Sequence, residues 1–332
     1  MRSITYFFRK EGVAYSIENV FQPIMQVTES FFTVNRFYAP KARARLLDML
    51  INAWAAKRMK SEINHITGDV HYLCLVLPRC RLVLTIHDMK DLDHYRGIKG
   101  WIYRKLWYDW PMKRARVVTF ISEFTKLEVM KRFALDQAKC IVIHNPVLPI
   151  FRPSLGGATV EKPVVLAIGT SENKNLSRLI DGIAGIDVHL RIIGQLDDGL
   201  IQKLRSQRVD YSNTCNLTSE EILREYELAQ VVSFVSTYEG FGLPIVEAQS
   251  VGRAVLASNI PSLVEIAGTG AHFVNPLDIA EIRVGIEIIC CDHVYRQHLV
   301  NLGFCNAKRF QVKEISEQYA KIYQQLVDEE IS

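Results

Sequence analysis

The sequence predicts an α/β protein of two doubly wound domains, each a parallel sheet covered by helices. The chain has 332 residues, which is long for one core and suits two domains. Short β-branched or aromatic runs alternate with longer amphipathic stretches, a pattern typical of parallel sheets with crossover helices. Residues 146–163, with four prolines and two glycines, interrupt this alternation, which then begins again. We therefore expect a linker there and one Rossmann-like domain on each side.

The first half of the chain, residues 1–150, forms the expected N-terminal domain. Six runs have the composition of strands: 4–8, 31–39, 70–77, 82–86, 117–121 and 140–147. Three stretches have helical periodicity: 16–26, 42–59 and 123–134. Ser122 is the expected N-cap residue of the last helix.

The second half, residues 151–332, forms the expected C-terminal domain. Its expected strands are 164–169, 188–194, 231–236, 253–258 and 271–274. Helices are expected at 176–183 and at 218–229, and the second begins with Thr218 and Glu221 at capping-box spacing. From Asp278 onward the pattern is almost wholly helical. The last helix, about 312–330, is assigned to this domain with the option of packing back toward the N-terminal domain.

Composition indicates a soluble globular chain, with 48% hydrophobic and 23% charged residues. The seven cysteines are odd in number and form no CxxC pair, so we expect reduced thiols, a cytoplasmic protein and no structural zinc. The N-terminus has no signal-peptide pattern. The most apolar window, 70–86, contains Pro78, Arg79 and Arg81, and we interpret it as two buried strands rather than a membrane span.

Charge is divided unevenly along the chain. Residues 1–150 contain 24 Lys and Arg against 13 Asp and Glu, a net charge of +11, whereas the remainder contains 16 against 23, a net charge of −7. A basic N-terminal half indicates that this half meets an anionic partner. From charge alone, nucleic acid and anionic lipid both remain open.

The stretch YEGFGLPIVE, residues 238–247, follows a predicted strand and combines a glycine loop with the start of a helix. Gly240 and Gly242 can adopt positive φ and let the backbone approach a ligand closely. Pro244 suits the first position of a helix, and Gly252 suits the position just after its end. Free N–H groups at such a helix start bind anions, so a diphosphate would fit there.

Two carboxylates flank this anion site. Glu247, near the start of the helix, could accept hydrogen bonds from a ribose diol beside the diphosphate, as acids in dinucleotide sites do. Glu239, on the strand side, would face whatever lies beyond the diphosphate. The alternative is that Glu247 only stabilises the helix dipole and that Glu239 is solvated.

Glu239 and Glu247, separated by seven residues, resemble the E-x7-E signature of retaining GT-B glycosyltransferases of family 4. Residues 164–180, 190–194 and 257–278 resemble other parts of that family's C-terminal domain. A weaker resemblance covers TIHD (85–88), ISEFTK (121–126) and VIHNPV (142–147). The resemblance implies a GT-B fold, in which two Rossmann-like domains face each other across a cleft.

The resemblance also implies the substrates. The N-terminal domain would bind the acceptor and the C-terminal domain a UDP-, GDP- or similar nucleotide sugar, with no cofactor and no metal. It implies Glu239 and His87 as catalytic residues, with Glu239 at the transferred sugar. It implies these donor-binding residues: Gly169, Thr170, Asn173, Lys174, Gly240, Phe241, Gly242, Leu243 and Glu247. Lys174 would neutralise the diphosphate, and Glu247 would hold the ribose.

One feature departs from the family pattern. Family members often carry an arginine just before the lysine or shortly after the preceding strand, where this chain has Asn173 and Thr170. Arg178, one turn further on, is either a substitute cation or a surface helix residue. In the N-terminal half, Gly12 alone stands where the family often has a glycine-rich loop.

Several polar residues in the N-terminal half have competing interpretations. His87 and Asp88 follow the strand 82–86 and would face the cleft, or they cap the next segment. HITGDVH, residues 65–71, fits no metal-binding spacing, and we expect a loop-to-strand turn there. Asp91-Leu92-Asp93 spells the DxD of metal-dependent glycosyltransferases, but we do not interpret it as a metal site.

Residues 94–116 interleave aromatic and basic side chains, and residues 42–60 add to the same basic surface. This composition suits a membrane interface or the stacking of nucleic-acid bases. Given the resemblance, a lipid-linked saccharide at the inner face of the plasma membrane is the expected partner, and nucleic acid is not. The alternative is an ordinary helix with a solvated basic face.

The resemblance implies a retaining, metal-independent glycosyltransferase of bacterial surface polysaccharide assembly, covering lipopolysaccharide, O-antigen or capsule. The acceptor would be a saccharide or a lipid-linked saccharide. The resemblance implies that the leaving phosphate takes the acceptor proton. Three alternatives remain at this point: a GT-B nucleotide-sugar epimerase, a phosphorylase, and a catalytically inactive nucleotide-sugar-binding protein.

Overall fold

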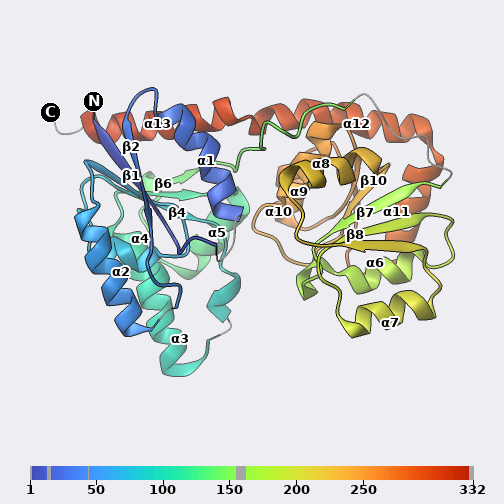
Figure 1. Ribbon diagram of the computed structural model, residues 1–332, viewed down its shortest axis with the longest axis horizontal. Helices are drawn as coiled ribbons and strands as arrows, with labels where there is room; N and C mark the ends of the chain where they lie inside the picture. Colours follow the sequence, from blue (N-terminus) through green and yellow to red (C-terminus); the bar gives the residue numbers. More distant parts are fainter. Residues whose placement is uncertain (1, 13–15, 44, 94, 155–161, 329–332) are drawn as a thin grey trace. The chain divides into compact units, whose positions relative to one another are not determined.

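The computed structural model describes residues 2–12, 16–43, 45–93, 95–154 and 162–328. Two six-stranded sheets, in which every strand pairing is parallel, form its framework (Figure 1). Contacts divide the chain into two compact units. Unit 1 comprises Met1–Pro146 and Val312–Ser332, and unit 2 comprises Val147–Gln311.

Unit 1 contains the sheet β2-β1-β3-β4-β5-β6. Its strands are β1 (Ser3–Phe8), β2 (Thr33–Tyr38), β3 (Ile63–Ile66), β4 (Leu82–Ile86), β5 (Val117–Phe120) and β6 (Cys140–Val142). Its α-helices are α1 (Ser16–Thr28), α2 (Leu46–Arg58), α3 (Gly97–Tyr103), α4 (Trp110–Arg114), α5 (Glu123–Arg132) and α13 (Val312–Asp328). Short helical turns are η1 (His71–Leu75), η2 (Lys90–Asp93), η3 (Arg104–Asp109) and η4 (Gln137–Lys139).

Helices cover both faces of this sheet, and successive strand residues point to opposite faces, so both sets of side chains are buried. Tyr6 of β1 and His65 of β3 lie on the face covered by α1 and α13, where both rings contact Tyr323. Phe7 and Ile66, the next residue of each strand, join the core on the other face beneath α2, η1 and α4. The helices on the two sides of the sheet are visible in Figure 1.

Helix α13 completes unit 1 through two buried tyrosines, although its sequence follows unit 2. Tyr319 and Tyr323 are almost wholly buried. The Tyr323 hydroxyl lies 2.7 Å from Nδ1 of His65, and Nε2 of His65 lies 2.8 Å from the Thr85 hydroxyl. Because buried polar groups are costly without partners, these bonds fix where α13 packs on the sheet.

The strand predicted at 70–77 is wrong. His71–Leu75 forms the 3₁₀ turn η1, and the strand lies at Ile63–Ile66 instead. Four consecutive η1 residues are buried, so this apolar run fills the core without the alternation of a strand. The strand INHI was not predicted; its two polar residues, Asn64 and His65, are buried and both have hydrogen-bond partners. The window 70–86 therefore contains one strand, β4, rather than two.

Unit 2 contains the sheet β12-β11-β10-β7-β8-β9. Its strands are β7 (Val164–Ile168), β8 (His189–Ile193), β9 (Tyr211–Thr214), β10 (Val231–Phe234), β11 (Ala254–Ser258) and β12 (His272–Val274). Its helices are α6 (Leu176–Ile183), α7 (Asp198–Ser206), α8 (Ser219–Leu228), α9 (Leu243–Val251), α10 (Pro261–Ala267), α11 (Ile279–Cys291) and α12 (His293–Ala307), with turns η5 (Glu172–Lys174) and η6 (Lys308–Phe310). Helices α6 and α7 cover one face of the sheet, and α8 and α9 cover the other (Figure 1).

Several local predictions are confirmed. The capping box of Thr218 and Glu221 is formed at the start of α8, and Gly252 ends α9 in the left-handed conformation. Ser122 caps α5 by accepting a bond from the Thr125 amide. Strand β9 and helices α7 and α10 were not predicted.

Each sheet is doubly wound, as the sequence predicts, and each has a switch point where the strand order reverses. In unit 1 the chain proceeds from β1 to β2 on one side and then to β3 on the other. In unit 2 it proceeds from β7 through β8 and β9 and returns to β10 on the other side of β7. Ligands of doubly wound sheets bind at the carboxyl edge beside such a point.

Candidate functional site

The switch point of unit 2, between β7 and β10, brings together most of the residues that the sequence predicted. The loop after β7 begins at Gly169, which has φ +91°, a left-handed conformation that favours glycine. A Cβ atom there would lie only 3.0 Å from two carbons of the Lys174 side chain. Gly169 therefore gives the lysine room to fold back over the end of the strand.

Lys174 and Glu239 meet directly across this switch point. Lys174 Nζ donates to Glu239 Oε1 at 2.7 Å, and it lies 4.5 Å from the ring centroid of Phe234, the last residue of β10. Both side chains are mostly buried, so the pair is shielded from bulk water. A cation and a carboxylate are thus held together at the carboxyl edge of the sheet, where ligands of doubly wound sheets bind.

Asn173 holds the second loop in place rather than presenting a charge. Its backbone carbonyl accepts from the Thr237 amide at 2.8 Å. Its side-chain amide donates to the Tyr238 carbonyl at 3.1 Å and to Glu239 Oε1 at 3.2 Å. The residue at one of the two positions where an arginine was expected therefore ties the β7 loop to the β10 loop and orients Glu239.

Asn175, which the sequence reasoning did not identify, adds a second tie. It has φ +60°, is buried, and donates from its side chain to the carbonyls of Val235 and Pro276 at 2.9 and 2.6 Å. Arg178 Nη1 donates to the Asn175 side-chain oxygen at 2.9 Å. Arg178 thus supports Asn175, which agrees with a structural role for this arginine.

The glycine loop leads into α9 as expected, with two corrections. Gly242 has φ +101°, and a Cβ there would lie 2.7 Å from Leu263 Cδ2, but Gly240 does not have positive φ. Pro244 is the second residue of α9, after Leu243. No side chain caps this helix start. Among the residues that the structure describes, the Leu243 amide has no acceptor, so it is available to an anion.

The side chains of Phe241 and Thr170 are less available to a ligand than their positions in the sequence suggested. The Phe241 side chain is buried against Phe310, so its ring belongs to the core of unit 2. The Thr170 hydroxyl donates to the Gln195 carbonyl at 2.7 Å, which fixes the loop after β8. Both predicted residues lie at the site, but their side chains are engaged with protein groups.

Glu247 is held by Tyr226, a residue of α8 that the sequence did not single out. The wholly buried Tyr226 hydroxyl donates to Glu247 Oε2 at 2.7 Å. Burial raises the pKa of Glu247 to about 7, and the hydrogen bond from Tyr226 opposes this rise. Burying the ionised form of Glu247 costs free energy, which is why its pKa is raised. Ionisable groups with strongly shifted pKa values cluster at functional sites.

His87 lies at the carboxyl end of β4 in unit 1. Its Nε2 is 2.7 Å from the Thr67 carbonyl, so Nε2 carries the proton and donates. Burial lowers the pKa of His87, which keeps the ring neutral. Gly68 permits this approach, because a Cβ there would lie 2.8 Å from His87 Cδ2. Asp88 accepts from the Lys90 amide and so caps the following turn.

The other polar segments of unit 1 are structural. The loop-to-strand turn predicted for HITGDVH is wrong, because this segment leaves strand β3, passes through a loop and enters η1. His71 bonds the Trp107 carbonyl. Within the described part of the chain, no three His, Cys, Asp or Glu side chains are grouped so as to hold a metal ion. Asp91 and Asp93 fall in η2, and Gly12 has φ +78° with open space around it.

Two family models match the chain, one in each half. The model described as glycosyl transferases group 1 matches residues 162–291, which include the switch point of unit 2. The model described as glycosyltransferase family 4 matches residues 24–149.

Individual proteins are similar to this chain in sequence or in fold. The chain is 27% identical over 311 residues to O-antigen chain mannosyltransferase B of Escherichia coli, covering 85% of this chain and 79% of that protein. Sucrose-phosphate synthase from Thermosynechococcus elongatus has a similar structure, with a TM-score of 0.81, 16% identity and coverage of 98% and 99% of the two chains. Anabaena Alr3699/HepE, in complex with UDP and glucose, has a TM-score of 0.76, 16% identity and coverage of 97% and 100%.

Proposed function

Because the chain belongs to glycosyltransferase family 4, we propose that it transfers a hexose from a nucleoside diphosphate sugar to a saccharide or lipid-linked saccharide. The acceptor would be part of a bacterial surface polysaccharide. Similarity to an O-antigen mannosyltransferase supports this setting, and similarity to a structure in complex with UDP and glucose supports the donor class. The epimerase, the phosphorylase and the inactive binding protein are not favoured by these relatives.

The observation that carries the proposal is the arrangement at the β7/β10 switch point. Lys174 and the free amide at the start of α9 suit a diphosphate, which gains negative charge as it leaves the sugar. Glu247, oriented by Tyr226, suits a ribose diol. Glu239 is oriented by Asn173. When a diphosphate binds Lys174 in place of Glu239, the Glu239 carboxylate would be available to contact the transferred sugar.

The proposed reaction retains the configuration at the anomeric carbon and uses no metal or cofactor. The bond between the anomeric carbon and the diphosphate oxygen breaks while the acceptor oxygen bonds to the same face. The acceptor proton passes to the leaving phosphate oxygen. In this proposal His87 contacts the transferred sugar, and its unprotonated Nδ1 accepts a hydrogen bond from a hydroxyl.

The acceptor is proposed to reach the protein at an anionic membrane surface. Among the described residues, no helix is both long enough and apolar enough to cross a bilayer. Helix α2 nevertheless exposes Leu46, Leu47 and Trp54, and α3 exposes Ile98 and Trp101. Basic residues accompany these side chains, and Arg58 stacks on Trp54 at 3.5 Å. Exposed apolar and basic side chains together suit peripheral binding at the cytoplasmic leaflet.

The test has two steps. A thermal-shift screen of nucleotide sugars identifies the donor, because a ligand that binds only the native state raises its melting temperature. The donor is then incubated with lipid-linked saccharide acceptors, and the product's anomeric configuration is read by NMR. Stabilisation by one nucleotide sugar and a retained product are expected. A product of inverted configuration would refute the retaining mechanism, and hydrolysis or epimerisation without transfer would refute the transferase proposal.

A further inference from the structure

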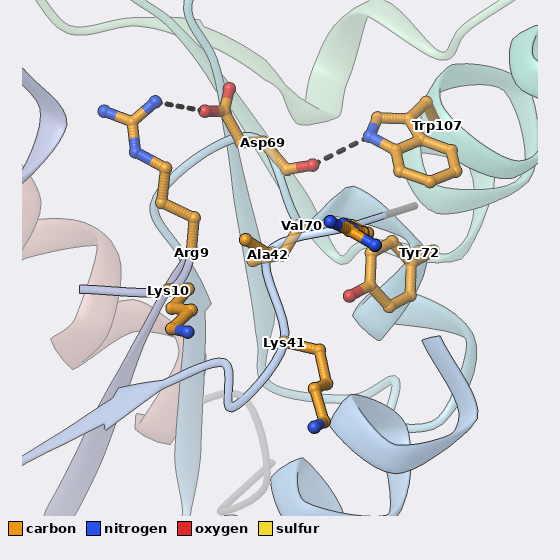
Figure 2. A pocket seen from close by; sticks show the side chains of 9 residues that line it. Arg9, Lys10, Lys41, Ala42, Asp69, Val70, Tyr72 and Trp107 are labelled. Atoms are coloured by element: carbon orange, nitrogen blue, oxygen red, sulfur yellow. Dashed lines mark hydrogen bonds and ion pairs between the residues drawn. The ribbon is translucent and has the colours of Figure 1, made fainter. Parts of the chain in front are cut away.

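A pocket of about 120 Å³ lies at the other switch point, beyond the carboxyl ends of β1, β2 and β3 in unit 1 (Figure 2). We call it the basic pocket. Its charged and aromatic lining residues include Arg9, Lys10, Lys41, Arg43, Asp69 and Trp107. Arg9 and Lys10 follow β1, Lys41 follows β2, and Asp69 follows β3, so the pocket occupies the carboxyl edge where doubly wound sheets bind ligands.

The charges of the basic pocket are not balanced. Arg9 pairs with Asp69 at 2.5 Å and with Glu18 at 3.4 Å. By contrast, Lys10, Lys41 and Arg43 have no ion-pair partner among the residues that the structure describes. Three uncompensated cations that line one small concavity create a positive potential that favours an anion.

The loop backbones of the basic pocket are fixed by buried groups. Asn52 of α2 is wholly buried; its Oδ1 accepts from the Lys41 amide at 2.9 Å, and its Nδ2 donates to the Lys41 carbonyl at 3.0 Å. Trp107 Nε1 donates to the Asp69 carbonyl at 2.7 Å (Figure 2). Asp69 itself has φ +53°, a conformation that side-chain-bearing residues seldom adopt. These contacts hold the backbones of Lys41 and Asp69 in one arrangement at the pocket.

We propose that the basic pocket binds a phosphate or diphosphate group of the acceptor substrate. This inference rests on the proposed function and adds the chemical class that the acceptor must contain. A planar guanidinium with its fork of donors and two mobile ammonium groups suit phosphate oxygens. Three uncompensated positive charges match a multiply charged phosphate better than a single carboxylate. The exposed part of Trp107 offers an aromatic face to a neighbouring sugar or lipid segment.

Tryptophan fluorescence provides a local readout with the full-length protein. All four tryptophans, at 54, 101, 107 and 110, lie in unit 1, and Trp107 lines the basic pocket, so its emission reports directly on a ligand bound there. Titration with inorganic pyrophosphate is expected to change the emission with saturation. The Trp107→Phe variant should lose most of this change.

Two charge-matched variants decide whether the site is specific. Lys41→Gln/Arg43→Gln should weaken pyrophosphate binding about tenfold or more, because it removes two charge-assisted contacts. Lys57→Gln/Lys60→Gln removes the same charge from exposed residues outside the pocket and should change binding by no more than about twofold. Equal weakening in both variants, or no fluorescence change in the wild type, would overturn the proposal.

Transfer assays separate this inference from the proposed function and identify the source of the phosphate. Lys41→Gln/Arg43→Gln should raise the KM for phosphate-bearing acceptors at least about fivefold and leave the KM for the same saccharide without phosphate unchanged. A diphosphate lipid saccharide and a soluble sugar phosphate are compared as the two sources. Equal KM changes for acceptors with and without phosphate would overturn the role of the basic pocket. A wild type that transfers to neither acceptor would overturn the transferase proposal. In that case the fluorescence titration would still decide whether the pocket binds a phosphate group.

Discussion

The two switch points of this protein have similar topology but opposite electrostatics. In unit 2 the cation Lys174 is neutralised by Glu239, and the nearby Glu247 is held by a tyrosine. In unit 1 three cations of the basic pocket have no such partner among the described residues. The first arrangement suits a ligand with both a diphosphate and hydroxyl groups, and the second suits a ligand recognised by its charge. If both proposals hold, the same edge of a doubly wound sheet serves two kinds of substrate in this protein.

The largest effect on the unit 2 site is expected from Lys174→Ala. This change removes a charge-assisted contact to the diphosphate and leaves Glu239 to repel it, so donor affinity should fall about 10- to 100-fold. Isothermal titration with the donor measures the loss. Lys162→Ala is the matched control, because Lys162 pairs with Asp187 and Asp210 away from the switch point. Wild-type affinity in Lys174→Ala would show that the diphosphate binds elsewhere.

A smaller effect is expected from Gly169→Ala. The alanine Cβ would lie 3.0 Å from the Lys174 side chain at a positive φ, so it both strains the loop and displaces the lysine. The conformational strain should cost about 1–3 kcal/mol of unfolding free energy, and donor affinity should also fall several-fold.

Gly185→Ala provides the matched control for that variant. Gly185 also has positive φ, at +78°, but open space surrounds it. Chemical denaturation should show a loss of stability in both variants, whereas titration should show a loss of donor affinity in Gly169→Ala alone. Equal affinities in the two variants would contradict the contact between Gly169 and Lys174.

Tyr226→Phe is expected to change donor affinity by a few-fold, and the size of this change should depend on pH. Burial raises the pKa of Glu247 to about 7, and loss of the tyrosine hydrogen bond should raise it further. A ribose diol donates to the carboxylate, so donor affinity should increase as pH rises through 7 in the wild type and at higher pH in the variant. Titrations from pH 6 to 9 measure both profiles. Tyr295→Phe, which removes a hydroxyl bonded to His272, should keep the wild-type profile.

The buried histidines of unit 1 and the buried Glu247 of unit 2 should also contribute to stability with opposite dependence on pH in the absence of ligand. Burial lowers the pKa of His65 to about 3 and of His71 to about 4, so their neutral forms stabilise unit 1 above about pH 6.5. This stability is lost as pH falls from about 6.5 toward those values. The raised pKa of Glu247 has the opposite sign, because its contribution is present below about pH 4.5 and is lost as pH rises through 7.

Hydrogen exchange, corrected for intrinsic rates, measures this difference. Between pH 7 and pH 5.5, protection of β3 and η1 should decrease by about 1 kcal/mol or more, while α9 should not lose protection through Glu247. Parallel loss of protection in both regions would contradict the assignment of the buried groups.

The sequence predicted the parts of this protein that depend on local patterns. Thr218 and Glu221 are three residues apart and form their capping box whatever surrounds them. Lys174 and Glu239 each follow a predicted strand, and the carboxyl ends of neighbouring parallel strands share one edge. The two Rossmann-like sheets and the place of both residues at one sheet edge could therefore be anticipated, whereas the ion pair between them was not predicted.

Tertiary packing determined what the sequence could not show. Tyr226 meets Glu247 because α8 packs beside α9, and no spacing in the chain signals that contact. Strand β3 was missed because its Asn64 and His65 are polar, and only the folded structure supplies their partners. The basic pocket combines residues from three strand ends with Trp107, and only the positive net charge of the first half could be predicted for this region from the sequence.

The most direct test of the donor site measures whether the preference for ribose over deoxyribose depends on Glu247. UDP and GDP are compared with their 2′-deoxy analogues by titration against the wild type and Glu247→Ala at pH 8. For the nucleotide that binds, the wild type should prefer the ribose form about tenfold or more, because a carboxylate accepts its hydroxyl hydrogen bond. Glu247→Ala should bind both forms with equal, weaker affinity. An undiminished preference for ribose in Glu247→Ala would contradict the role of Glu247 and with it the proposed donor site.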